Sequence, residues 1–202
     1  MSSFDERAAT WDDPVKIERA AVVARVIGET IRLDGAMRVL EYGAGTGLVT
    51  QALRNMVGPV TLVDTSVGMR DVMADKVARG VIPDARVWDL DLSTDAPPDE
   101  QFDLVVTVLT LHHIPQIDPV LASFAALLAD GGSVCIVDLE AEDGSFHGEG
   151  FEVHHGFDRS WLTARLEAAG FTDVSFRRCH EIARGDGTYP LFLATARIDR
   201  TS

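Results

Sequence analysis

The chain of 202 residues is predicted to form an α/β domain built on a doubly wound, mostly parallel sheet. Short runs of apolar and β-branched residues alternate with segments in which apolar residues recur at helical spacing. Short turns rich in glycine and aspartate connect these segments. The run at residues 102–109 is almost continuously apolar, as expected of a parallel strand that is buried on both faces. Helices should therefore cover both faces of the sheet.

Helices are predicted where apolar residues recur every three or four positions. The first helix follows an aspartate pair, because Asp13 can cap it and Pro14 suits its first turn. Glycines mark several of the helix ends. The predicted helices are residues 14–33, 48–56, 67–79, 118–129 and 158–169.

Seven strands are predicted between and after these helices: residues 37–42, 60–63, 85–90, 102–109, 133–139, 172–178 and 189–198. No segment of helical length separates the last two, so we expect an antiparallel pair at one sheet edge, joined by a turn at residues 185–187. Residues 93–100 and 140–156 are predicted loops, and the second is long enough to be typical of a functional lid. No repeat, linker or composition shift divides the chain, which predicts a single domain over residues 1–202.

The chain is strongly acidic, with 32 Asp and Glu residues against 18 Lys and Arg residues and a formal net charge of −14. Binding to nucleic acid or to an anionic membrane depends on Lys and Arg that neutralise phosphate, so we expect neither partner. Every apolar run is far shorter than the roughly 20 residues that span a bilayer. The first residues have neither the basic nor the apolar region of a signal peptide, which predicts a cytoplasmic protein with Cys135 and Cys179 as buried thiols.

A glycine-rich turn lies between the first predicted strand and the following helix. Gly43, Gly45 and Gly47 permit a tight turn and allow backbone N–H groups to approach a ligand near the positive end of the helix dipole. A plain turn needs one glycine at most, so three predict a ligand-binding loop. The NAD fingerprint requires a third glycine at the position of Leu48, and no Gly-Lys-Ser/Thr of a nucleotide-binding P-loop follows.

The pattern E-x-G-x-G-x-G, which begins at Glu41, and the acid Asp64 at the end of the second strand resemble motif I of the class I S-adenosylmethionine-dependent methyltransferases. The resemblance covers nearly the whole chain. It implies a Rossmann-like methyltransferase fold, with a seven-stranded, mostly parallel sheet and an antiparallel edge pair, and S-adenosylmethionine as cofactor. It further implies an N-terminal helical lid (1–35), a cofactor-binding half (36–140) and an acceptor loop with the C-terminal strands (141–202).

The cofactor residues follow from this resemblance and from the chemistry of a sulfonium. Such a ligand has no phosphate, so the glycine loop packs on its methionine portion, while carboxylates suit its ammonium group and ribose hydroxyls. Asp64 is expected to bind the ribose diol, and Glu41 to orient the loop or the amino group. At the third strand either Asp89, with Leu90, or Asp91 meets the adenine, and we favour Asp89. The predicted cofactor set is Trp11, Glu41, Gly43, Gly45, Thr46, Gly47, Asp64, Thr65, Asp89, Leu90, Val108 and Leu109.

Two of these residues have a second interpretation. Trp11 belongs to an N-terminal segment that resembles the one folding over the cofactor in related enzymes, where a cation–π contact would cover the sulfonium. Trp11 would equally serve to anchor the first helix to the sheet. Thr46 begins the helix after the glycine loop and is expected to cap it.

The fourth strand is followed by Leu-His-His-Ile at residues 111–114, an ending that resembles small-molecule methyltransferases. It departs from the D/N-P-P-Y/F motif of enzymes that methylate amino groups of DNA bases or glutamine. Methyl transfer from a sulfonium is an in-line displacement, which needs a general base only if the acceptor must lose a proton. The candidates for a base or for acceptor contacts are His113, His154 and His155, and each would equally be a packing or surface residue. The neighbouring His112 is likewise either a base or acceptor contact or a packing residue.

The loop at residues 140–156 also contains His147 and Glu152. With His154 and His155 these residues would supply a base, bind an acceptor or hold a metal ion, but they match no standard zinc spacing. No metal site is therefore predicted.

The sequence thus predicts a methyltransferase that acts on a small-molecule acceptor. Two other functions stay open. The first is a non-catalytic, methyltransferase-like protein that keeps the cofactor pocket. The second is a nicotinamide-dependent oxidoreductase, which is opposed by Leu48 at the third glycine position.

Overall fold

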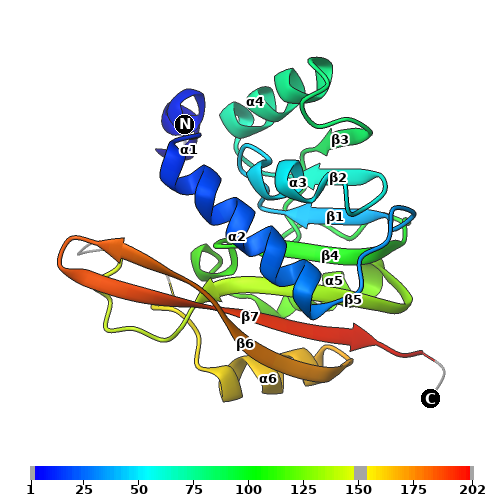
Figure 1. Ribbon diagram of the computed structural model, residues 1–202. Coiled ribbons are helices and arrows are strands. Elements are labelled where there is room, and N and C mark those ends of the chain that lie inside the picture. Colours follow the sequence, from blue (N-terminus) through cyan, green and yellow to red (C-terminus); the bar gives the residue numbers. More distant parts are fainter. Residues whose placement is uncertain (1–2, 148–153, 201–202) are drawn as a thin grey trace.

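The computed structural model describes residues 3–147 and 154–200, which form a twisted sheet with helices on both sides (Figure 1). Its elements, in chain order, are α1 (Ser3–Arg7), the 3-10 helix η1 (Ala8–Thr10), α2 (Pro14–Thr30), β1 (Val39–Tyr42), α3 (Leu48–Leu53), β2 (Val60–Val63), α4 (Val67–Ala78), β3 (Ala85–Trp88), β4 (Phe102–Val108), the 3-10 helix η2 (Leu111–His113), α5 (Asp118–Leu127), β5 (Leu128–Leu139), α6 (Arg159–Ala168), β6 (Phe171–Arg184) and β7 (Gly187–Ile198).

The seven strands lie in the order β3-β2-β1-β4-β5-β7-β6. The first five strands of the chain pair in parallel, and β7 runs antiparallel to both β5 and β6. The expected fold class, including the antiparallel pair, is confirmed. The strand order reverses between β1 and β4, and in open α/β sheets a ligand site lies beyond the carboxyl ends of the strands at such a point.

Two strands, β5 and β6, extend well beyond their predicted ranges. β6 continues to Arg184, because its pairing with β7 extends to the two-residue turn at residues 185–186 although its outer half is mostly exposed and shows little apolar alternation. β5 begins at Leu128, since the pair Gly131 and Gly132, expected to separate a helix from a strand, lies inside the strand. In both places long-range pairing overrides the local pattern.

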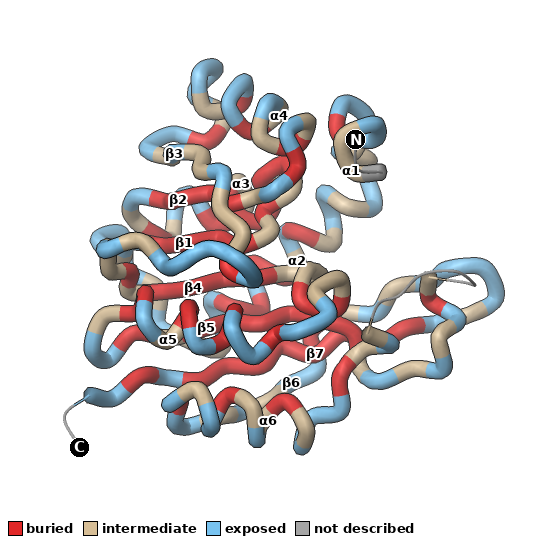
Figure 2. The backbone as a smooth tube through the Cα atoms, turned by 180° about the vertical axis from the view of Figure 1, so that it is seen from behind, coloured by how far each residue is buried: buried red, intermediate tan, exposed pale blue. Residues whose placement is uncertain are grey.

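Two hydrophobic layers enclose the sheet. Ile27 of α2, Leu53 of α3 and Met73 of α4 are buried against one face of the sheet. Phe124 of α5 and Leu162 of α6 are buried against the other face. Buried residues accordingly run along the central strands in Figure 2, which explains why these strands read as nearly continuous apolar runs.

The N-terminal segment, residues 3–13, docks on the end of α4 (Figure 1). The Asp5 carboxylate accepts hydrogen bonds from the Ser66 hydroxyl at 2.6 Å and from the Gly68 N–H at 3.2 Å. Asp12 forms an ion pair with the buried Lys76 of α4 at 2.6 Å. A Cβ atom on Gly68 would lie 2.8 Å from the carbonyl oxygen of Asp5, so this glycine permits the close approach. The segment is therefore fixed at two points.

The two cysteines are buried, as expected from the sequence. Cys135 and Cys179 are free, buried thiols, and burial raises their pKa to about 12 and about 11. Among the helices that the structure describes, none combines the length and the apolarity needed to cross a bilayer.

Gly156 offers a test of how the crossover from β5 to α6 is held. Gly156 and Gly185 both have positive φ, but a Cβ on Gly156 would lie 2.1 Å from the Glu140 carbonyl oxygen, whereas Gly185 has open space. We expect Gly185→Ala to lower the free energy of unfolding by about 1–2 kcal/mol. Gly156→Ala should lower it by at least about 3 kcal/mol, because displacement of backbone adds to the strain. Equal effects in urea denaturation would contradict this packing.

Candidate functional site

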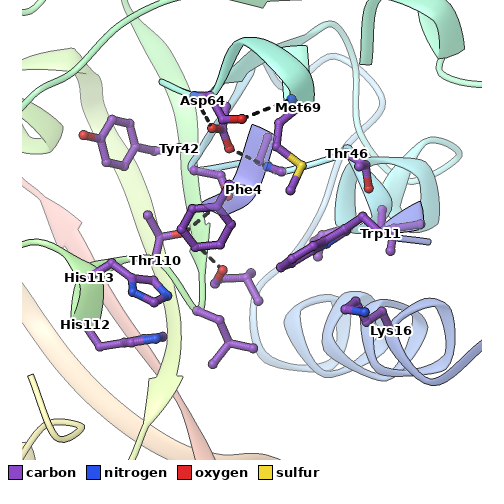
Figure 3. Close-up of a pocket in the computed structure, with 18 of the residues that line it drawn as sticks. Phe4, Trp11, Lys16, Tyr42, Thr46, Asp64, Met69, Thr110, His112 and His113 are labelled. Carbon is purple, nitrogen blue, oxygen red and sulfur yellow. Dashed lines mark hydrogen bonds between the residues drawn. The ribbon is translucent and has the colours of Figure 1, made fainter. Parts of the chain in front are cut away.

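A cavity of about 920 Å³ lies where the carboxyl ends of β1, β2 and β4 meet (Figure 3). The N-terminal segment, α2, residues 146–147 of the loop after β5 and the end of β6 complete its walls. Ligand pockets in proteins commonly measure about 300–1,000 Å³, so this cavity is large enough for a cofactor together with a small second substrate. Of the predicted cofactor set, its lining includes Trp11, Glu41, Gly43, Gly45, Thr46, Asp64, Thr65, Leu90, Val108 and Leu109.

The glycine loop adopts a conformation that favours glycine at all three positions. Gly43, Gly45 and Gly47 have φ values of +69°, +58° and +77°. A Cβ on Gly43 would lie 2.2 Å from the side chain of Thr110, whereas on Gly45 it would meet only Trp11 Nε1, at 3.8 Å. Gly43 is thus required for packing against the end of β4, and Gly45 leaves its backbone accessible from the cavity. Gly47 lies outside the lining.

Asp64 fixes the glycine loop to the end of β2. Its Oδ2 accepts the Gly45 N–H at 2.8 Å, and its Oδ1 accepts the Ser66 N–H at 2.9 Å. Burial raises the pKa of this carboxyl above its usual range. Because each oxygen has a second lone pair, the carboxylate can still accept hydrogen bonds from a ligand in the cavity.

Glu41 holds the helix that follows the loop. Its carboxylate accepts the Thr50 N–H at 3.0 Å and the Thr50 hydroxyl, and it therefore caps the first turn of α3 from β1. Burial raises the pKa of Glu41 to about 7. The expectation that Thr46 caps this helix is wrong, because the Thr46 hydroxyl donates instead to Asp12 of the N-terminal segment.

The structure separates the two acids expected near the adenine. Asp91 and Leu90 line the cavity, whereas Asp89 has a side chain that is 68% exposed and forms an ion pair with Arg70 at 2.8 Å. β3 ends at Trp88, so strand alternation no longer sets the side-chain directions beyond it. The structure thus brings Asp91 to the cavity and leaves Asp89, the acid favoured from the sequence, outside its lining.

Aromatic residues of the N-terminal segment cross the mouth of the cavity. The Phe4 ring lies between Trp11 and His113, with centroid separations of 5.8 Å and 5.4 Å (Figure 3). Trp11 also has the Lys16 ammonium 4.8 Å and the Arg7 guanidinium 5.1 Å from its ring centroid. The ring of Trp11 thus faces one cation of the N-terminal segment and one of α2, as well as the cavity.

Three histidines gather at one end of the cavity. His112, His113 and His147 line it, and their rings lie 4.1–5.1 Å apart between centroids. His112 Nδ1 lies 2.6 Å from the Oδ1 of Asp138, and both side chains are almost fully buried. Burial, together with the neighbouring His112 and His147, lowers the pKa of His113 to about 4. An imidazole with this pKa is neutral near pH 7 and a weak proton acceptor.

The other two predicted histidines lie outside the cavity lining. His154 Nε2 donates to the Pro115 carbonyl at 3.2 Å, and its ring contacts Phe157. The His155 side chain is 53% exposed and lies 3.5 Å from Glu142. The loop at residues 140–156 thus brings His147 to the site and leaves His154 and His155 outside it. Glu152, considered with them, lies outside the described residues.

Sequence reasoning missed Asp138 and Phe4 as site residues. Asp138 lies one residue before the end of β5, and Asp64 directly follows β2, so a search for acids at the carboxyl ends of all strands would have found both. Phe4 lies on a five-residue helix whose contacts are long-range, and no local signal marks it. Leu109, which was predicted, has a φ of +53°, an uncommon conformation for a leucine that is typical of strained functional sites.

Fold and site together define a class I S-adenosylmethionine-dependent methyltransferase: the strand order, the glycine loop at the switch point and the acids beside it all belong to this class. A family model described as a methyltransferase domain matches residues 15–176, and the chain belongs to this family. The expected family and its cofactor, S-adenosylmethionine, are thereby confirmed.

Individual relatives agree with this class. The chain is 32% identical over 119 residues to an uncharacterized methyltransferase of Schizosaccharomyces pombe. The matched stretch is 55% of this chain and 42% of that protein. It is 26% identical over 183 residues to the ubiquinone/menaquinone biosynthesis C-methyltransferase UbiE of Stutzerimonas stutzeri, covering 73% of this chain and 71% of UbiE. The chain therefore spans less than half the length of the first of these relatives.

Two solved structures show the same fold. The DhpI–SAH complex superposes with a TM-score of 0.72 and 26% identity, covering 98% of this chain and 94% of that one. The N-methyltransferase NodS of Bradyrhizobium japonicum WM9, in complex with S-adenosylhomocysteine, gives a TM-score of 0.70 and 20% identity, with 93% and 89% covered.

The raised pKa of Glu41 predicts how stability depends on pH. The folded protein binds this proton more tightly than an unfolded chain, whose Glu has a pKa of 4.5, so the free energy of unfolding should fall as pH rises from 4.5 to about 7. Glu41→Gln keeps an oxygen that can accept from Thr50 and removes this titration. In the unaltered protein the free energy of unfolding should fall by an amount on the order of 2–3 kcal/mol across this interval, and in the variant this fall should be absent. Urea denaturation at a series of pH values measures both. Identical pH profiles for the two proteins would contradict the assignment.

Proposed function

We propose that the protein transfers the methyl group of S-adenosylmethionine to a small-molecule acceptor by in-line displacement. One observation carries this proposal: a single cavity is lined by the glycine loop with Glu41 and Asp64 and also by the histidines, with Asp64 and the histidines on different sides of it (Figure 3). Its volume of about 920 Å³ suits two small ligands better than a polymer. The relative UbiE, named for quinone biosynthesis, supports a small acceptor.

The glycine loop and the acids beside it fit the cofactor. The open Cβ position of Gly45 leaves room for a ligand beside the loop backbone, and Asp64 presents a fixed acceptor for hydroxyl groups. We assign the ribose to Asp64, the methionine portion to the glycine loop and Glu41, and the adenine end to Leu90 and Asp91. Bound S-adenosylmethionine supplies a methyl group that is activated by the adjacent sulfonium.

The remaining task of the chain is to align the acceptor and to exclude water. We propose residues 1–35 as the lid for this step, since Phe4 and Trp11 of its described part lie across the cavity. Asp5 and Asp12 hold this segment to α4, so water exclusion depends on these two contacts. His113 is the proposed acceptor contact, because it lines the cavity and touches Phe4, whereas His154 and His155 do not line it.

Incubation with methyl-labelled S-adenosylmethionine and a metabolite extract tests the proposed activity. We expect label in the small-molecule fraction, and the labelled product identifies the acceptor. Label found only in protein or nucleic acid would contradict a small-molecule acceptor. Cofactor binding with no labelled product in any fraction would favour a non-catalytic protein.

Substitutions at the acids test the binding assignment. Asp64→Ala should weaken S-adenosylhomocysteine binding by at least about tenfold, because a lost hydrogen bond to a charged group costs roughly 1.5–3 kcal/mol. Gly45→Val should abolish binding, since a branched side chain would enter the cavity from a backbone with a φ of +58°. Asp91→Ala should weaken binding, and Asp89→Ala, the matched control, should leave it unchanged. Calorimetry that shows the reverse order for Asp89 and Asp91 would refute the assignment to Asp91.

A further inference from the structure

The histidine cluster contains an arrangement that methyl transfer by alignment does not need. Among the described residues, His112, His113 and His147 each offer one ring nitrogen, and these three atoms lie within 4.8 Å of one another. The three come from two segments, η2 at the end of β4 and the loop after β5. The fold therefore brings together residues that are more than thirty positions apart in the sequence.

Asp138 fixes which nitrogen of His112 faces the cluster. Its Oδ1 lies 2.6 Å from His112 Nδ1 and also accepts the N–H of Leu139 at 2.8 Å. A carboxylate only accepts hydrogen bonds, so Nδ1 is the donor to Asp138 and Nε2 is the nitrogen left for a ligand. That Nε2 is buried and has no hydrogen-bond partner in the part of the chain that the structure describes. A buried polar atom without a partner is costly, and here a ligand would satisfy it.

We propose that His112, His113 and His147 bind one divalent transition-metal ion at the acceptor end of the cavity. Imidazole nitrogens suit Zn²⁺, Co²⁺, Ni²⁺ and Fe²⁺, and a histidine that donates its other N–H to a carboxylate is the usual arrangement around such ions. Three protein ligands beside an open cavity correspond to a site with a free coordination position, as in catalytic rather than structural zinc sites.

The geometry requires only a small adjustment. Two nitrogens bound to one zinc at about 2.0–2.1 Å lie about 3.3 Å apart in a tetrahedral site. The three ring nitrogens lie at most 4.8 Å apart, so each ring has to move by only about an ångström or less to reach this spacing. His112 is held by Asp138, so movement of the His113 and His147 rings toward it would close the site.

The charge balance indicates what completes the site. Asp138, Glu142 and Arg184 all act electrostatically on His147, and their formal charges sum to −1. A divalent ion therefore leaves one positive charge, which an anionic oxygen or sulfur in the cavity would neutralise. This last step rests on the proposed function, since it places the acceptor on the free coordination position. Metal binding itself does not rest on it.

Metal titration of the metal-free full chain, with any affinity tag removed, tests the proposal without cofactor or acceptor. We expect one Co²⁺ per chain, seen as visible absorption of a coordinated ion, and its displacement by Zn²⁺. His147→Ala and His113→Ala should each weaken Zn²⁺ binding by at least about tenfold. Asp138→Asn, which keeps an oxygen to accept from His112, should weaken binding by about 10–100-fold, the usual effect of changing such a partner.

His180→Gln is the matched control, because His180 lies on β6 outside the cavity lining, and its Zn²⁺ affinity should equal that of the unaltered protein. Thermal unfolding checks that each variant is folded. Absence of stoichiometric metal binding in the unaltered protein would overturn the proposal, as would unchanged affinity in folded His147→Ala and His113→Ala. Because no cofactor is present, either result leaves the proposed methyl transfer standing, and failure of methyl transfer leaves the metal result unaffected.

Discussion

The hydrogen bond from the Gly45 N–H to the Asp64 carboxylate is the contact on which the site depends. It joins the loop after β1 to the end of β2, two neighbouring parallel strands, and so sets the shape of the glycine loop. Glu41, on β1 just before the loop, holds the start of α3 by accepting the Thr50 N–H. With these two carboxylates in place, the backbone of the loop faces the cavity and the cofactor side of the site is formed without any ligand.

Several of the acidic residues that give the chain its negative charge hold parts of the structure together. The net charge of −14 first served to exclude polyanionic partners. The structure shows that several acids bind parts of the chain to one another: Asp5 holds the start of α4, Asp12 pairs with Lys76, and Asp138 orients His112. Together with Glu41 and Asp64, these acids shape the cavity. Much of the remaining acid lies on exposed loops and contributes to the excess only as surface charge.

Most of the fold could be predicted from the sequence because its signals are local. The buried strands, the helix that begins after Asp13 and the glycine loop each depend on neighbouring residues. The loop and the acid Asp64 together carried the resemblance that indicated the class of cofactor. The histidine cluster could not be predicted, because it depends on a loop of irregular backbone that returns to the end of β4. The sequence offered His154 and His155 as readily as His147, and only the fold separates them.

Asp89 and Asp91 are a second case in which the sequence could not predict which residue reaches the cavity. Both follow β3 within three residues, and the path of the chain beyond Trp88 decides which of them reaches the cavity. Pairing with neighbouring strands sets where a strand ends, as in the outer half of β6. The position of that end then decides the direction of the next side chains.

Calorimetric titration of the full chain with S-adenosylmethionine and, separately, with NAD tests the central claim most directly. The account predicts one molecule of S-adenosylmethionine bound per chain, at least about tenfold more tightly than NAD. Tighter binding of NAD, or no measurable binding of S-adenosylmethionine by the folded protein, would contradict it.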